Sequence, residues 1–139
     1  MDAKEFLQQL AYYQEVQRNK RDILNEIKAN AVAIGMPSDE KIKKSRKNDK
    51  ISDYLSKIEK AQLDLQKALS DAVEIQLQVI EVIEQLPNKG EREVLYARYV
   101  HNMHYDSIAR QTGYSIDHTK TLHRQGLKSV EKILRKNKT

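Results

Sequence analysis

The sequence has no cysteine and no tryptophan, and its 139 residues include only four glycines and two prolines. The absence of cysteine excludes disulfides and thiolate metal sites. The scarcity of glycine and proline leaves few positions at which a helix must end. No apolar run is long enough to span a bilayer and no signal peptide is recognisable, so we expect a soluble, cytoplasmic protein with no membrane partner.

Charge is distributed unevenly along the chain. Residues 86–139 contain eleven lysines and arginines against five aspartates and glutamates, a net charge of +6, whereas residues 1–85 have a net charge of −1. Three of the positive charges fall in the tail from Arg135 to Thr139, which we expect to fray. A basic C-terminal part is typical of nucleic-acid binding, because neutralised phosphates release counterions. A solvated basic surface is the alternative.

Apolar residues recur at alternating steps of three and four through the middle of the chain. The series is Ile51, Tyr54, Ile58, Ala61, Leu65, Ala68, Ala72, Ile75, Val79, Val82 and Leu86. Such a heptad repeat predicts one long helix, about 50 Å in length, that packs in a coiled coil.

The N-terminal segment has a weaker stripe with the same period. Its apolar positions are Phe6, Leu10, Tyr13, Val16, Ile23, Ile27 and Ile34, with Lys20 and Asn30 as polar interruptions. Gly35 and Pro37 follow in the order that ends helices. We therefore predict an all-α fold, in which a long antiparallel helical hairpin over residues 1–85, with a loop at about 35–50, precedes a helix-turn-helix domain over residues 86–139.

Leu63, Val73, Leu77 and Ile80 lie off the heptad seam and give the second long helix another apolar face. A helix with two apolar faces needs a second neighbour. We expect a homodimer, since helix-turn-helix proteins commonly place two recognition helices on two half-sites. The alternative is packing against the C-terminal helices of the same chain.

The segment from Ile108 to Ile116 predicts a sharp turn between two helices. Ile108 and Ala109 give the first helix a small apolar face, and Gly113 supplies the left-handed backbone position that a tight turn requires. The Ser115 hydroxyl can cap the next helix, which we expect to begin near Ile116.

This last helix sorts its residues by face. Thr119, Leu122, Leu127 and Val130 share one side at helical spacing, and the opposite side holds Asp117, Lys120, Thr121, Arg124 and Lys128. We expect the first set to pack and the second to contact double-stranded DNA, because recognition helices lie in the major groove, where these side-chain types bind bases and phosphates. A small three-helix core with a solvated basic face is the alternative.

Six positive charges lie between Lys41 and Lys50, within the predicted loop. Lys43, Lys44, Arg46 and Lys47 are candidate contacts to the DNA backbone, since such a cluster attracts phosphate. The alternative is a solvated connection between the two long helices.

The sequence gives little support for catalysis. His101 and His104 could form a metal pair, but no acidic or cysteine ligand completes it. We expect the histidines to pack or to contact phosphate, and we predict no catalytic residue, no metal site, no cofactor and no enzyme activity.

Several of these residues also carry a resemblance to known proteins. The run Leu86-Pro87, Glu91-Arg92-Glu93-Val94-Leu95, Arg98-Tyr99, Ile108-Ala109, Gly113-Tyr114-Ser115, Lys120 and Leu127 resembles region 4 of bacterial sigma factors, the part that reads the promoter −35 element. The whole chain, including Lys47-Asn48-Asp49-Lys50-Ile51 and the segment from Leu122 to Lys128, is similar to small phage and prophage proteins related to the ArpU and RinA late-gene regulators. This resemblance implies a role in late transcription in a bacterial host cell.

The resemblance to sigma region 4 implies which residues contact DNA. They are Ser115, Ile116, Asp117, Lys120, Thr121 and Arg124, with Lys128 nearer the backbone. Thr112, Thr119 and Gly126 depart from the sigma pattern and predict a weakened small core. Nothing resembles the sigma segments that melt promoters. We therefore expect a sequence-specific transcriptional regulator, and the alternative is an adaptor that docks on host RNA polymerase or on another phage or host factor.

Overall fold

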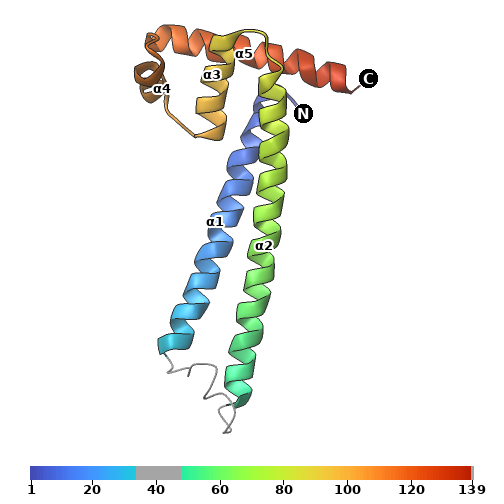
Figure 1. Ribbon diagram of the computed structural model, residues 1–139, viewed down its shortest axis with the longest axis vertical. Helices are drawn as coiled ribbons and strands as arrows, with labels where there is room; N and C mark the ends of the chain where they lie inside the picture. Colours follow the sequence, from blue (N-terminus) through green and yellow to red (C-terminus); the bar gives the residue numbers. More distant parts are fainter. Residues whose placement is uncertain (34–47, 139) are drawn as a thin grey trace. The chain divides into compact units, whose positions relative to one another are not determined.

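The computed structural model describes residues 1–33 and 48–138, which are helical apart from short turns (Figure 1). The elements are α1 (Ala3–Ala33), α2 (Asn48–Glu84), α3 (Lys89–Leu95), the π-helical segment η2 (Tyr96–Val100), α4 (Tyr105–Thr112) and α5 (Ile116–Asn137). No strand occurs within the described ranges. The predicted all-α fold is confirmed.

The chain forms two compact units. Unit 1 comprises Met1–Tyr13 with Ala72–Thr139, and unit 2 comprises Gln14–Asp71. Both long helices therefore contribute to both units. The division of the chain at residue 85 into two domains stays a prediction. The candidate residues Lys43, Lys44, Arg46 and Lys47, and the helix end expected at Gly35 and Pro37, lie outside the described residues.

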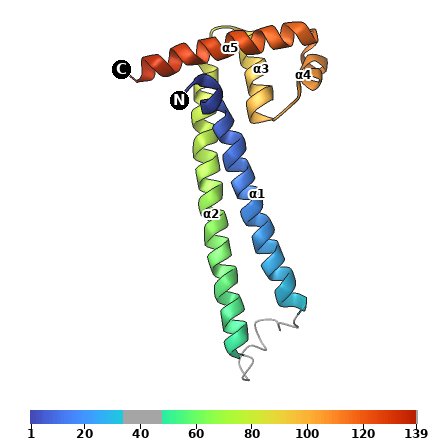
Figure 2. The ribbon, with the colours of Figure 1, turned by 180° about the vertical axis from the view of Figure 1, so that it is seen from behind.

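Unit 2 is a pair of antiparallel helical segments. Both views show the later part of α1 beside the earlier part of α2 (Figures 1 and 2). The buried apolar residues of this unit are Leu24, Ala31, Ile51, Ala61 and Ala68. Every position of the predicted heptad series, from Ile51 to Leu86, is buried or half-buried, so this apolar seam is confirmed.

The prediction is wrong at one position of the N-terminal stripe. We expected Ile23 to face inward, but its side chain is 46% exposed, whereas that of Leu24 is 6% exposed. Ala3, Leu10, Leu24 and Ala31 are all buried and are separated by multiples of seven residues. This spacing returns a residue to the same side of a packed helix pair. Ile23 falls one position outside that series and therefore faces away.

The core of unit 1 joins residues that are far apart in the sequence. Its buried members are Ala3, Leu7, Leu10, Val79, Val82, Ile83, Leu86, Leu95, Tyr99, Val100 and Val130. The first turns of α1 and the last turns of α2 thus pack with α3, η2 and α5. The Ala3 backbone N–H also donates a hydrogen bond to the Glu131 carboxylate at 2.8 Å, which fixes the start of α1 against α5.

The second apolar face of α2 is only partly covered within the chain. Ile80 packs against the core of unit 1. Leu63, Val73 and Leu77 are exposed, with at least half of each side chain accessible. Packing within the described part of the chain therefore covers Ile80 and leaves Leu63, Val73 and Leu77 exposed.

Candidate nucleic-acid interface

A second, smaller core in unit 1 positions α4 beside α5. Its buried members are Val94, Ala97, Ile108 and Leu122, with Met103 and Tyr114 packed against them. The Arg98 guanidinium donates to the Met103 carbonyl at 3.0 Å, which ties the segment before α4 to η2. The helix pair α4 and α5 is therefore held from one side by α3 and η2, and the other side of α5 faces solvent.

The turn between α4 and α5 has the predicted chemistry. Gly113 adopts φ = 80°, in the left-handed region, and its N–H donates to the Ala109 carbonyl at 2.9 Å. The Ser115 hydroxyl accepts from the His118 backbone N–H at 3.0 Å, and α5 begins at Ile116. The predicted turn glycine, capping serine and helix start are all confirmed.

Glycines bring α3 and α5 close together. A Cβ atom at the buried Gly126 would lie 2.9 Å from Leu95 Cδ1, and one at Gly90 would lie 3.1 Å from Leu122 Cδ1. Each helix thus places a leucine over a glycine of the other. We expected Gly126 to weaken the core, and this interpretation is wrong, because Leu95 occupies the space that a side chain at Gly126 would need.

The two threonines that depart from the sigma pattern also fit their surroundings. Thr119 is completely buried, and its hydroxyl donates to the Ser115 carbonyl at 2.9 Å. The Thr112 hydroxyl donates to the Ile108 carbonyl at 2.7 Å. A buried hydroxyl with a hydrogen-bond partner avoids most of the cost of burial. The cost of these polar residues is therefore largely offset within the turn.

The outer face of α5 carries the candidate DNA contacts. Ser115, Ile116, Asp117, Lys120, Arg124 and Lys128 are exposed, and Thr121 is half-buried. Thr119, Leu122 and Val130 are buried on the other side, and Leu127 is half-buried there. The predicted separation into a packing face and a polar face is therefore confirmed, whereas the contacts to DNA stay a prediction.

Three of these candidate residues are linked by hydrogen bonds. The Thr121 hydroxyl donates to the Asp117 carbonyl at 3.0 Å and accepts from the Arg124 guanidinium at 3.4 Å. Arg124 is thereby directed along the outer face of α5, and Thr121 serves as its positioning residue. The candidate arginine is partly preorganised, which lowers the entropy lost on binding.

A cluster of aromatic rings packs around His123 of α5, and no local sequence pattern indicated it. The His123 ring lies between two tyrosine hydroxyls, with Tyr99 Oη 2.7 Å from Nε2 and Tyr105 Oη 3.2 Å from Nδ1. The Arg98 guanidinium lies 4.5 Å from the centre of the Tyr105 ring, and Lys120 Nζ lies 5.9 Å from it. This cluster places Lys120 beside the junction of α4 and α5.

The electrostatics of this cluster favour a neutral imidazole. Burial, and then the positive charges of Arg98 and Lys4, lower the pKa of His123 from its ordinary value of 6.5. Burial also raises the pKa of Tyr99. His123 therefore acts as a packing and hydrogen-bonding residue, one of the two roles expected for the histidines. No group of three potential metal ligands occurs in the part of the chain that the structure describes.

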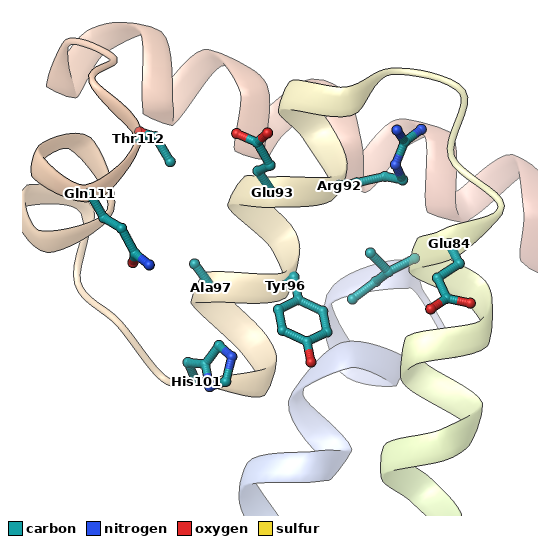
Figure 3. Close-up of a pocket in the computed structure, with 9 residues that line it drawn as sticks. Glu84, Arg92, Glu93, Tyr96, Ala97, His101, Gln111 and Thr112 are labelled. Atoms are coloured by element: carbon teal, nitrogen blue, oxygen red, sulfur yellow. The ribbon is translucent and has the colours of Figure 1, made fainter.

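Unit 1 also has a pocket on another side of α3 (Figure 3). The pocket has a volume of about 680 Å³, and its lining residues are Ile83, Glu84, Arg92, Glu93, Tyr96, Ala97, His101, Gln111 and Thr112. In this view α5 passes behind α3, so the pocket opens on the side of α3 away from α5. The Tyr96 and His101 rings meet edge to face, 5.0 Å apart. The sequence did not indicate this pocket, because its lining comes from separate helices.

Comparison with known proteins gives one match. Residues 82–132 match the model of the family described as Sigma-70, region 4. The match covers the end of α2, all of α3, η2 and α4, and most of α5. No curated protein and no solved structure matches the chain. The C-terminal part therefore contains a sigma region 4-like helix-turn-helix of the DNA-binding type. No helix in the described ranges is both long enough and apolar enough to cross a membrane.

Proposed function

We propose that this protein is a sequence-specific DNA-binding transcriptional regulator that inserts α5 into the major groove. The observation that carries the proposal is the outer face of α5, which presents Lys120, Arg124 and Lys128 from a helix whose start is fixed by a turn glycine and a capping serine. The match of this segment to sigma region 4 supports the same conclusion.

Six of the seven candidate residues contact DNA directly in this proposal, and Thr121 positions Arg124. Lys120 and Arg124 can donate to guanine O6 and N7, and Asp117 can accept from cytosine N4. Ile116 is 45% exposed at the first turn and can contact a thymine methyl group. Ser115 and Lys128 stand at the two ends of this surface, where they can bind backbone phosphate.

The proposal is tested by selecting bound duplexes from a random pool with the full-length protein. We expect a defined site, and we expect Lys120→Ala and Arg124→Ala to lower affinity for it by about 1 to 3 kcal/mol each while helicity stays unchanged. A protein that selects no sequence, or variants that bind like the wild type, would contradict the proposal.

The proposed setting is a phage or prophage in a bacterial cell, with a role in late transcription in the host cytoplasm. This part of the proposal rests on the resemblance to the ArpU and RinA regulators. Transcription from neighbouring late genes, measured with and without the protein, tests it. Unchanged transcript levels at a promoter that carries the selected site would exclude this setting.

We further propose that the protein acts as a homodimer through its helical hairpin. The exposed residues Leu63, Val73 and Leu77 support this assignment, because an uncovered apolar face favours association. Sedimentation of the full-length protein at tens of micromolar, on the order of ordinary assay concentrations, should show a dimer. A monomer at that concentration overturns the assignment.

The loop residues Lys43, Lys44, Arg46 and Lys47 are proposed contacts to the DNA backbone. Replacing all four by glutamine should weaken binding to every duplex alike and flatten its salt dependence, because each lost phosphate contact removes roughly one unit of slope. An unchanged salt slope assigns the loop to a solvated connection.

A second candidate function is favoured by the pocket beside α3. In that case the protein is an adaptor whose sigma-like part docks on RNA polymerase. The pocket opens on the side of α3 away from α5, so a protein partner and DNA could be bound together. An adaptor should co-purify with core polymerase and show little preference among duplexes, which separates the two functions.

A further inference from the structure

Positive charges recur at every fourth residue along α5. The residues are Lys120, Arg124, Lys128, Lys132 and Lys136, and all five are exposed. A step of four residues advances a helix by about 6 Å and turns it by about 40°, so the row is about 24 Å long and winds about 160° round α5. Lys128, Lys132 and Lys136 span about 80° of that turn, to one side of Lys120 and Arg124. Between residues 120 and 136 there are six cations and one carboxylate, that of Glu131.

The C-terminal half of α5 is held firmly against the rest of unit 1. Leu127, Ile133 and Leu134 pack against the core that contains Val130. Glu131 accepts a hydrogen bond from the Ala3 backbone N–H. The helix continues to Asn137, and fraying of the tail from Arg135 stays a prediction. Lys132 is thus presented from a fixed helix.

Compensation of the helix dipole does not explain the whole row. Arg135 and Lys136 lie in the last turn, where cations interact favourably with the helix C-terminus, and Arg135 also lies 3.9 Å from Glu131. This effect falls off within that turn. Lys128 and Lys132 lie further from the end, and neither takes part in an ion pair with any described residue.

We propose that Lys128, Lys132 and Lys136 form a phosphate-binding surface that holds the DNA backbone beside the base-reading turns of α5. The inference rests on the proposed function and extends its contact surface from Lys128 toward the end of α5. Lys136 lies beyond the family match, which ends at residue 132. The row is about 24 Å long, and the major groove is about 12 Å wide. A helix with its N-terminal residues at the base edges therefore carries its last turns to the phosphates at the rim.

The test uses the full-length protein and the double variant Lys132→Gln with Lys136→Gln. Glutamine has a helix propensity close to that of lysine and removes its charge. We expect equal losses of affinity for the selected site and for an unrelated duplex. The slope of log affinity against log salt should fall by about 1.8, since each phosphate contact contributes about 0.9. Between 50 and 200 mM salt, the variant should lose about twelvefold less affinity than the wild type.

The matched control is Lys60→Gln with Lys67→Gln, which removes two exposed lysines of α2. The control should keep the wild-type slope.

The inference is overturned if the variant Lys132→Gln with Lys136→Gln keeps the wild-type slope, or if it loses affinity for only one of the two duplexes. It is also overturned if these lysines bind an acidic protein surface instead of DNA. If Arg124→Ala abolishes sequence preference while the variant Lys132→Gln with Lys136→Gln keeps the wild-type slope, the inference fails and the proposed function stands. If the slope falls but no sequence is preferred, the inference stands and the proposed function fails.

Discussion

At the scale of single residues, Gly126 shows why a small side chain is needed in the middle of a helix. Glycine costs about 1 kcal/mol relative to alanine in a helix interior, so its presence in α5 requires a compensating contact. The Leu95 side chain provides it, because its Cδ1 atom lies only 2.9 Å from the position that a Cβ at Gly126 would take. Leu95 is itself completely buried and has little room to move.

Gly126→Ala should therefore lower the free energy of unfolding by about 1 to 2 kcal/mol, because overpacking outweighs the gain in helix propensity. Urea denaturation measures the change. Adding Leu95→Val to Gly126→Ala should recover part of the loss. Gly113→Ala is a useful comparison. Nothing lies within 4 Å of a Cβ placed at Gly113, so this substitution introduces backbone strain at the positive φ without overpacking. Equal stability of Gly126→Ala and wild type would contradict the packing argument.

His123 should make stability depend on pH. Its pKa is lowered in the folded protein by burial and by the charges of Arg98 and Lys4. Below the ordinary pKa of 6.5, the unfolded chain takes up a proton at this ring while the folded protein does not, so stability is full above that pH and falls as the pH drops through it.

Unfolding midpoints measured between pH 8 and pH 5 test this prediction. The wild type should lose stability below about pH 6.5, and His123→Gln should lose less. His118→Gln, at an exposed position of the same helix, should behave like the wild type. An identical pH dependence in His123→Gln and wild type would show that another group is responsible.

At the scale of elements, the first turns of α1 are structural parts of the helix-turn-helix unit. Leu7 and Leu10 are completely buried in the core that also holds Val130 of α5. The Ala3 backbone N–H is bonded to Glu131 of the same helix. Removing apolar volume from α1 should therefore loosen α5.

Leu7→Ala should cost about 2 to 5 kcal/mol of stability and should speed hydrogen exchange at the amides of α5. Ile23→Ala is the matched control on the same helix, because the Ile23 side chain is exposed, and it should change stability by no more than about 0.5 kcal/mol. A large loss of stability in Ile23→Ala would instead support the sequence-based prediction that Ile23 faces inward.

At the scale of the whole molecule, unit 1 needs both ends of the sequence. Leu86, Leu95 and Val130 of the C-terminal region pack against residues from α1 and from the last turns of α2. Without these partners, residues 86–139 keep the smaller core around Ile108 and five of the eleven buried residues of the larger core.

A fragment of residues 86–139 should therefore be largely unfolded or bind DNA much more weakly than the full chain, because a domain of this size with half its core missing is marginal. Circular dichroism and duplex binding measure this. A fragment of residues 72–139 should be intermediate, and adding a peptide of residues 1–13 should increase its helicity. A fully stable 86–139 fragment would show that α1 is dispensable.

The features that could be predicted from the sequence are those encoded by near neighbours. Gly113 and Ser115 determine the turn and the start of α5 within three residues, and the faces of α5 follow from helical spacing. The contact of Tyr99 with His123 joins residues 24 apart, and that of Ala3 with Glu131 joins residues 128 apart. No local pattern encodes such pairs. The exposure of Ile23 could not be predicted from the sequence. Whether Ile23 or the adjacent Leu24 faces inward depends on the neighbour against which the helix packs.

The contact of α1 with α5 also sets a delay during synthesis of the chain. Leu7 and Leu10 leave the ribosome early, but their partner Val130 is made about 120 residues later. At about 5 to 20 residues per second, that interval is roughly 6 to 24 seconds. Throughout it, two leucines that end in a closed core are open to water and to other chains. The polar face of α5 is therefore held in place only after Val130 has been made, and the nascent chain has to remain unaggregated until then.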